Sequence, residues 1–517
     1  MMTVNLDNNM LRVLFCALLL LLVGCRGEFG SNEIKQGKPN ILLILVDDMG
    51  YGDLKSYNPQ SKIPTPNLDR HATEGMRFTD AHAPGAVCHP SRYGLLTGRY
   101  PFRTNTNVWP EQPVIEEDRM TIGSMLQSES YHTAMVGKWH LGFDESEAIQ
   151  ASQENAEESG NNTRAAYRTY EEGQVLPGGP VDRGFDSFFG IRASTDIPPY
   201  FYIRDDRVVN PPSDSIGNNY SGGFWTDIQG AFWREGGISP DLDLADVLPR
   251  FTEESIQVIE NHSSSNPDQP LFLYIAYPAP HTPWLPSQEF DAVSGAGMYG
   301  DFMAMVDSKI GEILSALDQQ GMSNETLVIF TSDNGPVWYD KDKEQFDHDS
   351  QGGLRGMKGD AYEAGHRMPF IVRWPRVVEQ GTVSHQTISF TDLMATFADV
   401  LDTELPDSTG EDSFSLYSVL AGEHSGEESI RPPVVSVTSR GVRTIQDGKW
   451  KLIESLGSGG FTEPVYIDPE AGGPEGQLYN LEDDLDETNN LWLDHPDVVN
   501  RLQSILEDYD RNGRSRP

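Results

Sequence analysis

Four short, continuous apolar runs restrict the fold of this chain more than any other feature. They cover residues 41–46, 271–277, 327–330 and 370–372. Apolar runs of this length without polar alternation are typical of strands that are buried on both faces of a sheet. After the second run, apolar residues from Met303 to Leu317 recur at helical spacing, and Gly321 is the expected end of that helix. Strands that alternate with helices predict an α/β fold, with a large mixed, mainly parallel sheet flanked by helices.

The region from residue 431 onward has a different pattern. Short strand candidates at residues 434–437 and 449–453 precede a helical segment at residues 496–509. We therefore expect a main domain at residues 39–430 and a small C-terminal α+β subdomain at residues 431–517. Residues 144–180 are polar and acidic and contain Gly and Asn, which is typical of a surface insertion.

The first 25 residues predict export. Arg12 precedes an apolar run, too short to span a bilayer comfortably, that ends in Leu-Val-Gly-Cys at Cys25 and resembles a bacterial lipobox. We expect residues 1–24 to be a signal peptide, residues 25–38 a linker, and Cys25 the site of a lipid anchor that is the only membrane contact. The alternative is an ordinary signal peptide with an incidental cysteine, and Met10 is a second candidate start. The expected location is the periplasm, or the outer membrane or cell surface of a bacterium as a lipoprotein.

Acidic residues outnumber basic ones by 79 to 38, which gives a formal net charge of -41. Non-specific nucleic-acid binding depends on Lys and Arg that neutralise phosphates, so we expect no nucleic-acid partner. Three cysteines in 517 residues cannot build a disulfide scaffold. An anionic substrate would need a local basic pocket within this acidic chain.

Oxygen-bearing side chains follow two of the apolar runs. Asp47 and Asp48 come directly after the first run, and Asp333 and Asn334 come shortly after the third. In open α/β sheets, ligands bind beyond the carboxyl ends of the strands, and oxygen ligands suit hard cations. One acidic pair after a strand is more often a solvated turn, but two such strand ends can share an ion if the strands are neighbours. These four residues are therefore candidate metal ligands.

Cys88 begins a second candidate site. Pro90 suits the first turn of a helix and Gly98 suits its end, so Cys88 is expected at a helix N-terminus, where the helix dipole favours an anion. The residues alone leave two interpretations open. Cys88 is either a buried structural thiol, as is common for a lone cysteine, or a thiolate nucleophile.

The segment Cys88-x-Pro90-Ser91-Arg92, continuing into Leu-Thr-Gly-Arg, resembles the signature of the type I, formylglycine-dependent sulfatases of the alkaline phosphatase superfamily. The resemblance covers most of the chain, and further motifs occur in family order. They lie at residues 39–50, 66–69, 137–142, 280–283, 331–335, 353–359 and 478–481. The resemblance implies an alkaline-phosphatase-like fold and an enzyme that hydrolyses sulfuric esters.

In this family a maturation enzyme oxidises the cysteine to Cα-formylglycine, so the resemblance implies such an enzyme as a partner and an aldehyde at position 88. The hydrated aldehyde is a geminal diol. One hydroxyl attacks sulfur, and deprotonation of the other expels sulfate, whereas a plain serine ester would need a separate attack by water. Since Cys16 is expected to leave with the signal peptide and Cys25 to take a lipid, no free thiol would remain.

The resemblance also implies a metal centre. Asp47, Asp48, Asp333 and Asn334 match the family's metal ligands, and position 88 completes the set. Oxygen ligation favours one Ca²⁺ ion, with Mg²⁺ as the second choice.

The remaining roles are carried over from the family residue by residue. Arg92 is expected to hold the formylglycine, and Lys138 and Lys358 to bind sulfate oxygens. His140 is expected to assist collapse of the diol, and His281 to act on the leaving-group oxygen as general acid or electrophile. Lys138 and His140 are two residues apart, so both would point to the same side of an extended segment.

Each of these residues has an ordinary structural interpretation when taken singly, because a Lys near Gly is usually at the surface and a His after a strand is usually structural. The set together favours a site, since its members follow predicted strands. Three positions depart from the most common form of the family or are variable in it. Ala364 replaces a usual glycine, Leu485 replaces a usual proline, and His89 fills a variable position beside Cys88, where we predict slower maturation.

An exported bacterial sulfatase most simply serves polysaccharide breakdown, so the expected substrate is a sulfated oligo- or polysaccharide. Marine algal polysaccharides such as ulvan are our first choice, and glycosaminoglycans or fucan the second. Candidate substrate-contacting residues are Asp196, Tyr200, Tyr202, Trp225, Trp233, Trp284 and His348. Two alternatives are a phosphonate or phosphodiester hydrolase of the same superfamily, and a non-catalytic sugar-binding lipoprotein. The second has no need of a nucleophile.

Overall fold

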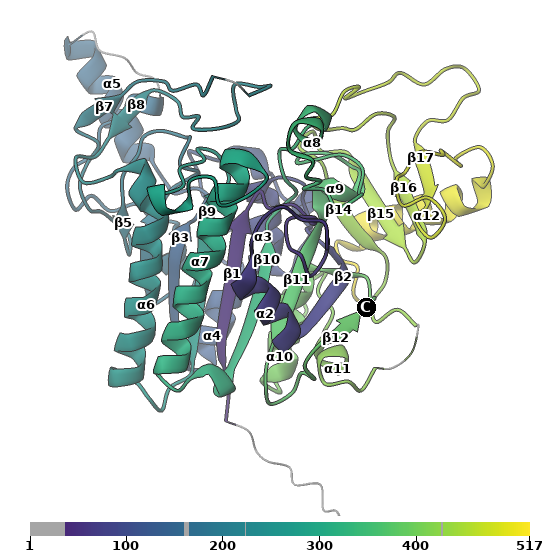
Figure 1. The fold of residues 1–517 in the computed structure, drawn as a ribbon, viewed down its shortest axis with the longest axis horizontal. Coiled ribbons are helices and arrows are strands. Elements are labelled where there is room, and N and C mark those ends of the chain that lie inside the picture. The colour runs from purple at the N-terminus through teal and green to yellow at the C-terminus, as the bar shows by residue number, and fades with distance from the viewer. Residues whose placement is uncertain (1–36, 160–164, 223, 425, 427) are drawn as a thin grey trace, which may run out of the picture. The chain divides into compact units, whose positions relative to one another are not determined.

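The computed structural model describes residues 37–159, 165–222, 224–424, 426 and 428–517 (Figure 1). Residues 39–517 form one compact unit. The predicted signal peptide, the lipid-carrying Cys25 and nearly all of the predicted linker lie outside the described residues. Within the described part of the chain, no helix combines the length and apolar character needed to cross a bilayer. The boundary predicted at residue 430 stays a prediction.

An eleven-stranded mixed sheet forms the centre of this unit (Figure 1). Its order is β12 (Thr382–Ser384), β2 (Met76–His82), β11 (Arg367–Arg373), β10 (Thr326–Ser332), β1 (Asn40–Asp47), β9 (Leu271–Pro280), β3 (His132–Lys138), β4 (Ser187–Ile191), β5 (Ile203–Arg204) and β6 (Arg207–Val208), with β13 (Ile388–Ser389) beside β2. Strands β10, β1, β9, β3 and β4 are parallel neighbours, while β11 pairs antiparallel with both β10 and β2. The predicted mixed, mainly parallel sheet is confirmed, and the four apolar runs lie in β1, β9, β10 and β11.

Helices cover both faces of the large sheet. One face is covered by α2 (Pro66–Glu74), α6 (Val247–Ser265) and α7 (Gly297–Gln319), and the other by α3 (Cys88–Thr97), α4 (Ile122–Ser128), α10 (Leu393–Val400) and α11 (Tyr417–Leu420). Side chains of a strand alternate between faces, so in β1 the odd-numbered residues from Ile41 to Leu45 join one core and the even-numbered ones from Leu42 to Val46 join the other. This double burial explains why the strand is apolar throughout.

The remaining elements extend this framework. They are α5 (Ser146–Ser159), the hairpin of β7 (Asp214–Ile216) and β8 (Gly236–Ile238), α8 (Asp340–Phe346) and α9 (Glu363–His366), and a four-stranded antiparallel sheet of β14 (Val434–Val437), β15 (Arg443–Asp447), β16 (Trp450–Ile453) and β17 (Gln477–Asn480) with α12 (Pro496–Asn512). The small sheet is tied to the main one by polar contacts. Buried Lys451 of β16 pairs with Glu363 of α9 and with Glu487, each at 2.8 Å.

The segment 144–180, predicted as a surface insertion, is in part buried. Glu145 accepts hydrogen bonds from Arg168 and Arg192, and its carboxylate also accepts one from Tyr170 at 3.1 Å. Polar composition was misleading here because these charges satisfy one another inside the protein rather than in water. Most described residues of the segment are exposed or part-buried, but the prediction of a surface insertion missed this buried cluster around Glu145.

His71 of α2 gives the stability a specific pH dependence. Both of its ring nitrogens are buried without a hydrogen-bond partner among the described residues, and burial, helped by Arg373 and Arg70, lowers its pKa to about 3. The unfolded chain takes up this proton near pH 6.5 and the folded chain does not, so folded stability falls as the pH falls through 6.5. Relative to His71→Leu, wild type should lose about 2 kcal/mol of unfolding free energy between pH 7 and pH 5, measured by urea denaturation. Parallel pH profiles of the two proteins would contradict this.

Candidate functional site

Four adjacent strand ends bring most of the predicted site residues together. The sheet order β10-β1-β9-β3 places Asp333 and Asn334, Asp47 and Asp48, His281 and Lys138 at the same edge. Strands β1 and β10 are paired in parallel with Val46 opposite Ser332, and the backbone N–H of Asp333 donates to the Val46 carbonyl at 3.0 Å. The two oxygen-rich strand ends are therefore neighbours, as a shared ion requires.

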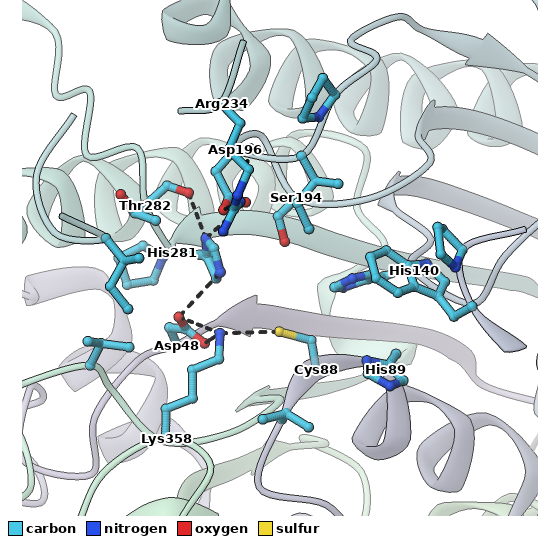
Figure 2. Close-up of a pocket in the computed structure, with 18 of the residues that line it drawn as sticks. Asp48, Cys88, His89, His140, Ser194, Asp196, Arg234, His281, Thr282 and Lys358 are labelled. Atoms are coloured by element: carbon cyan, nitrogen blue, oxygen red, sulfur yellow. Dashed lines mark hydrogen bonds and ion pairs between the residues drawn. The ribbon is translucent and has the colours of Figure 1, made fainter. Parts of the chain in front are cut away.

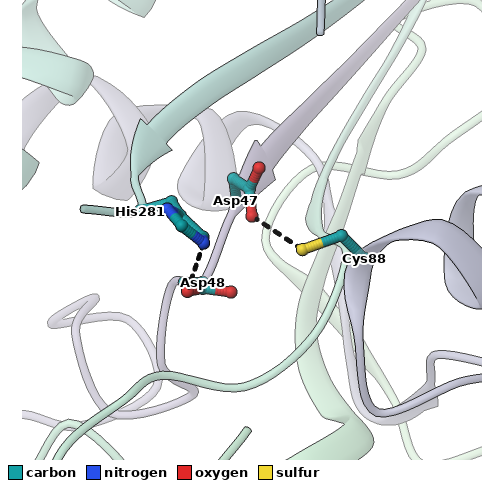
Figure 3. A group of neighbouring side chains, drawn as sticks. All are labelled: Asp47, Asp48, Cys88 and His281. Carbon is teal, nitrogen blue, oxygen red and sulfur yellow. Dashed lines mark hydrogen bonds and ion pairs between the residues drawn. The ribbon is translucent and has the colours of Figure 1, made fainter. Parts of the chain in front are cut away.

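Cys88 enters the same edge from the N-terminus of α3. The helix begins at Cys88 and ends with Gly98 in the left-handed conformation (φ 64°), as the sequence predicted. The Cys88 Sγ lies 3.3 Å from Asp47 Oδ1 and 3.5 Å from the Lys358 Nζ. Figure 3 shows Cys88 beside Asp47, and His281 beside Asp48.

Arg92, one helical turn after Cys88, is fully buried between two carboxylates. Its Nε donates to Asp333 Oδ2 at 2.9 Å, its NH2 contacts Asp47 Oδ2 at 3.2 Å, and its NH1 donates to the Lys138 carbonyl at 2.9 Å. These contacts fix the two aspartates relative to α3. The predicted hold of Arg92 on a formylglycine stays a prediction, because residue 88 is a cysteine in this structure.

The two lysines are paired with the acids that end β1. Lys138 forms a buried ion pair with Asp47, and Lys358 contacts both Asp48 carboxylate oxygens at 2.6 and 2.8 Å. Burial lowers the pKa of Lys358, but Asp48, Cys88 and Asp47 together outweigh burial and raise the pKa above the ordinary value. Both cations therefore stand beside Cys88 or its neighbour Asp47.

The prediction that Lys138 and His140 share an extended segment is wrong. Strand β3 ends at Lys138, and His140 has a left-handed backbone with φ 59°. His140 nevertheless lines the same cavity as Cys88, and neither of its ring nitrogens has a hydrogen-bond partner within the described part of the chain. Burial, then the charge of Lys138, lowers its pKa well below the ordinary value, so the ring is neutral and free to accept or donate.

His281 lies between two carboxylates at the end of β9. Its Nε2 is 3.6 Å from Asp48 Oδ2, and its Nδ1 is 2.6 Å from the Thr282 carbonyl oxygen. A carbonyl only accepts, so Nδ1 carries the proton there and Nε2 faces the site. Nε2 is thus aimed where a leaving-group oxygen would need it, and it can donate a proton to that oxygen only when both ring nitrogens carry one.

The charges of the site balance before any ligand arrives. Three carboxylates, of Asp47, Asp48 and Asp333, face three cations. Burial raises the pKa of Asp333 to about 6, with Asp47 adding to the rise. Burial also raises the pKa of Asp47, but Lys138 and the other cations outweigh it and hold the pKa below its usual range.

The acidic residues fit a divalent cation. Ligand atoms of Asp47, Asp48, Cys88 and His281 lie within 4.8 Å of one another. The Oδ1 of Asn334 is a buried oxygen that accepts no hydrogen bond from the described residues, while its Nδ2 donates to Asp48 Oδ1 at 2.7 Å. An orphan oxygen beside clustered carboxylates is a site that a hard cation would satisfy.

A cavity of about 490 Å³ opens onto Cys88 (Figure 2). Of the seven predicted substrate-contacting residues, Asp196 and Trp284 line it. The other five (Tyr200, Tyr202, Trp225, Trp233 and His348) do not. Trp225 is exposed and Trp233 is part-buried, so both stay candidates for the rim of the cavity. Tyr200 and Tyr202 pack in the core and His348 is buried against Asp53 at 2.9 Å, so the predictions of direct contact by these three residues are wrong. Aromatic residues that looked available for sugar stacking were taken up by the interior.

Several functional positions were missed by sequence reasoning. Trp109, Ser194, Arg234 and Phe461 also line the cavity, although they come from segments far apart in the chain. No local pattern marks them, since only the folded loops bring them together. Tyr299 was missed as well: it donates to Asp53, whose other oxygen holds His348, behind the turn that follows Asp48.

Comparisons with known proteins agree on one family. The sequence model described as Sulfatase matches residues 39–403. The chain is 34% identical to an N-acetylgalactosamine-6-O-sulfatase of Bacteroides thetaiotaomicron, covering 95% of this chain and 96% of that protein, and 31% identical to arylsulfatase A of Bos taurus, covering 91% and 86%. A solved structure described under the metabolism of multiple glycosaminoglycans by Bacteroides thetaiotaomicron superposes with a TM-score of 0.75 and 32% identity, covering 91% of this chain and 99% of that one. The PsFucS1 sulfatase from Pseudoalteromonas sp., 22% identical, shares the fold with a TM-score of 0.67, covering 98% and 94%.

Proposed function

The chain belongs to the sulfatase family, and we propose that it hydrolyses a sulfate ester of a carbohydrate. The substrate that we propose is 6-O-sulfated N-acetylgalactosamine. The observation that carries the proposal is the cavity that places Cys88 beside Lys358 and His281, in a chain similar along nearly its whole length to an N-acetylgalactosamine-6-O-sulfatase. That similarity supports glycosaminoglycan-type substrates over ulvan, which the sequence alone placed first.

We propose formylglycine at position 88 rather than thiolate catalysis. Burial, with Asp333 and Asp47, raises the pKa of the Cys88 thiol well above its ordinary value, so the unmodified side chain is a poor nucleophile despite its helix N-terminus. The hydrated aldehyde would supply a nucleophilic hydroxyl, and a divalent cation held by Asp47, Asp48, Asp333 and Asn334 would supply Lewis acidity beside it.

The other residues of the chain bind and orient the ester. Lys358 lines the cavity and the buried Lys138 pairs with Asp47 next to Cys88, so the two ammonium groups would neutralise the sulfate oxygens from there. The Nε2 of His281 gives a proton to the departing sugar oxygen, and the neutral His140 accepts one from the diol. Apolar walls that include Trp109 and Trp284 exclude water from the reacting groups.

The test is release of inorganic sulfate by the matured protein from defined substrates. We expect turnover of N-acetylgalactosamine 6-sulfate, and less or none of sulfated ulvan and fucan oligosaccharides. An aryl sulfate and an aryl phosphodiester, compared at equal concentration, separate a sulfatase from the phosphodiesterase alternative. Binding of sulfated sugar without any sulfate release would leave the non-catalytic alternative standing and refute the proposal.

A further inference from the structure

One buried carboxylate oxygen in the cavity has nothing to bind. Asp196 is only 4% exposed, and its Oδ1 accepts no hydrogen bond from any residue that the structure describes. The residue lies in the loop after β4, and its side chain lines the cavity that contains Cys88 (Figure 2). A carboxylate oxygen removed from water without a donor is costly, so this position calls for a partner that the described part of the chain does not provide.

The groups around Asp196 hold it in place without satisfying that oxygen. Its Oδ2 pairs with Arg234, whose NH1 also donates to the Asp196 carbonyl at 3.2 Å. The ring of His281 also approaches Oδ1, but its Nδ1 is 4.0 Å away and already donates to the Thr282 carbonyl at 2.6 Å. A separation of 4.0 Å is too long for a hydrogen bond. Asp196 is therefore oriented on one side and open on the other.

The position of the free oxygen relative to the reacting groups is fixed by His281. In Figure 2 this imidazole stands between Asp48, on the Cys88 side, and Asp196, on the far side. If the ester oxygen meets Nε2, the sugar carbons that follow extend toward Asp196. The walls there include the apolar Ile197, Pro198 and Trp284, and beside them Asp196 offers the sugar an unpaired, charged acceptor.

We propose that Asp196 is a specificity-determining residue whose Oδ1 accepts a hydrogen bond from a ring hydroxyl of the sulfated sugar, next to the ester. The inference rests on the proposed carbohydrate sulfatase function. A fixed acceptor requires a donor on the substrate and rejects an analogue that lacks it, because the carboxylate is then left buried and unpaired. It also repels an anion, so the sugar bears neither a carboxylate nor a second sulfate at this position. The substrate class is a neutral or N-acetylated sugar, not a uronate.

The first experiment needs no variant. Wild-type kcat/KM is measured on N-acetylgalactosamine 6-sulfate and on a set of its monodeoxy analogues, each lacking one ring hydroxyl. One analogue should be worse by about 10- to 100-fold, the loss expected for a hydrogen bond to a charged group. In Asp196→Asn the ratio of kcat/KM between the parent sugar and that analogue should fall below about threefold, since the acceptor is weakened and its charge is gone.

A second ratio separates sugar recognition from an effect on His281. The quotient of kcat/KM for N-acetylgalactosamine 6-sulfate over that for 4-nitrophenyl sulfate should fall at least about tenfold in Asp196→Asn, because the aryl ester has no hydroxyl to lose. Asp227→Asn removes the same charge from an exposed position beside the cavity-lining Ile228 and should leave this quotient at its wild-type value.

The outcomes distinguish the inference from the function beneath it. If Asp196→Asn loses the same factor in kcat/KM on the sugar and on the aryl sulfate, Asp196 is a positioning residue for His281 and the inference is overturned. It is also overturned if the wild type has the same kcat/KM on every deoxy analogue as on the parent sugar. Wild-type protein that releases sulfate from the aryl ester but from no sugar would instead overturn the carbohydrate function. Enhanced activity of Asp196→Asn on a disulfated or uronate-containing substrate is the positive result that the charge argument expects.

Discussion

Replacing Cys88 by alanine is expected to lower sulfate release by at least about 10⁴-fold, the scale on which loss of a catalytic nucleophile acts. The side chain is small and its contacts are few: the Sγ reaches Asp47 Oδ1 at 3.3 Å and the Lys358 Nζ at 3.5 Å. Alanine keeps the helix N-terminus of α3 and leaves Lys358 paired with Asp48, so the fold should persist. The measurement is turnover of 4-nitrophenyl sulfate, with circular dichroism to show that the variant is folded.

Cys88→Ser is the matched control for the chemistry. Serine keeps a hydroxyl at the same position but forms an ester that only a separate water attack would break, so we expect at most one turnover per protein molecule. Mass spectrometry of the active wild type should find the aldehyde in place of the thiol in the peptide that contains position 88. An active protein with an unmodified Cys88 would refute formylglycine chemistry here.

The edge of the sheet was predictable because its signal is local. Continuous apolar runs identify strands buried on both faces, and parallel strands end at one edge, so Asp47 and Asp333 could lie near one another if their strands were neighbours. The structure confirms the neighbouring strands with Val46 opposite Ser332. The helix from Cys88 to its glycine end was equally readable, because proline and glycine act through their own backbone preferences.

The parts that failed depend on contacts between distant segments. His140 has a left-handed backbone after β3, and the sequence Lys-Trp-His does not predict this conformation. Glu145 is buried because Arg168 and Arg192 fold over it, and polarity along the chain suggested the opposite. The walls of the cavity come from Trp109 and Phe461, which are hundreds of residues apart in sequence. Which distant residues come into contact is decided by the tertiary fold, and no periodic pattern along the sequence reveals it.

The balance of three carboxylates against three cations connects the global acidity to the local chemistry. In a chain of net charge -41, an anionic ester is repelled at long range, and Arg92, Lys138 and Lys358 offset this beside Cys88. All three are engaged with aspartates in the present structure. A divalent cation that took over those aspartates would leave the two lysines available to the sulfate group, so metal and substrate binding should be coupled.

Stripping divalent cations with a chelator should therefore reduce turnover by about 10²- to 10⁴-fold, and Ca²⁺ or, less effectively, Mg²⁺ should restore it. A ligand that binds only the folded state also raises its stability, so adding Ca²⁺ to chelated protein should raise Tm. The unfolding free energy should increase by about 2.7 kcal/mol when the ion is at 100 times its dissociation constant. The orphan Oδ1 of Asn334 and the clustered Asp47 and Asp48 are the structural basis for this gain.

Asp333→Ala tests whether the gain belongs to this site. The variant loses one carboxylate and frees Arg92 from its 2.9 Å contact, so its metal-free form starts from its own, lower Tm. The comparison is the Ca²⁺ concentration that gives half of the Tm rise, which should increase at least about tenfold in Asp333→Ala and stay at the wild-type value in Asp227→Ala. An unchanged midpoint in Asp333→Ala would place the ion elsewhere, and a chelated wild type with full turnover would remove the metal from the mechanism. Because the Tm readout needs no substrate, it reports on the metal site even if the sugar specificity proposed above is wrong.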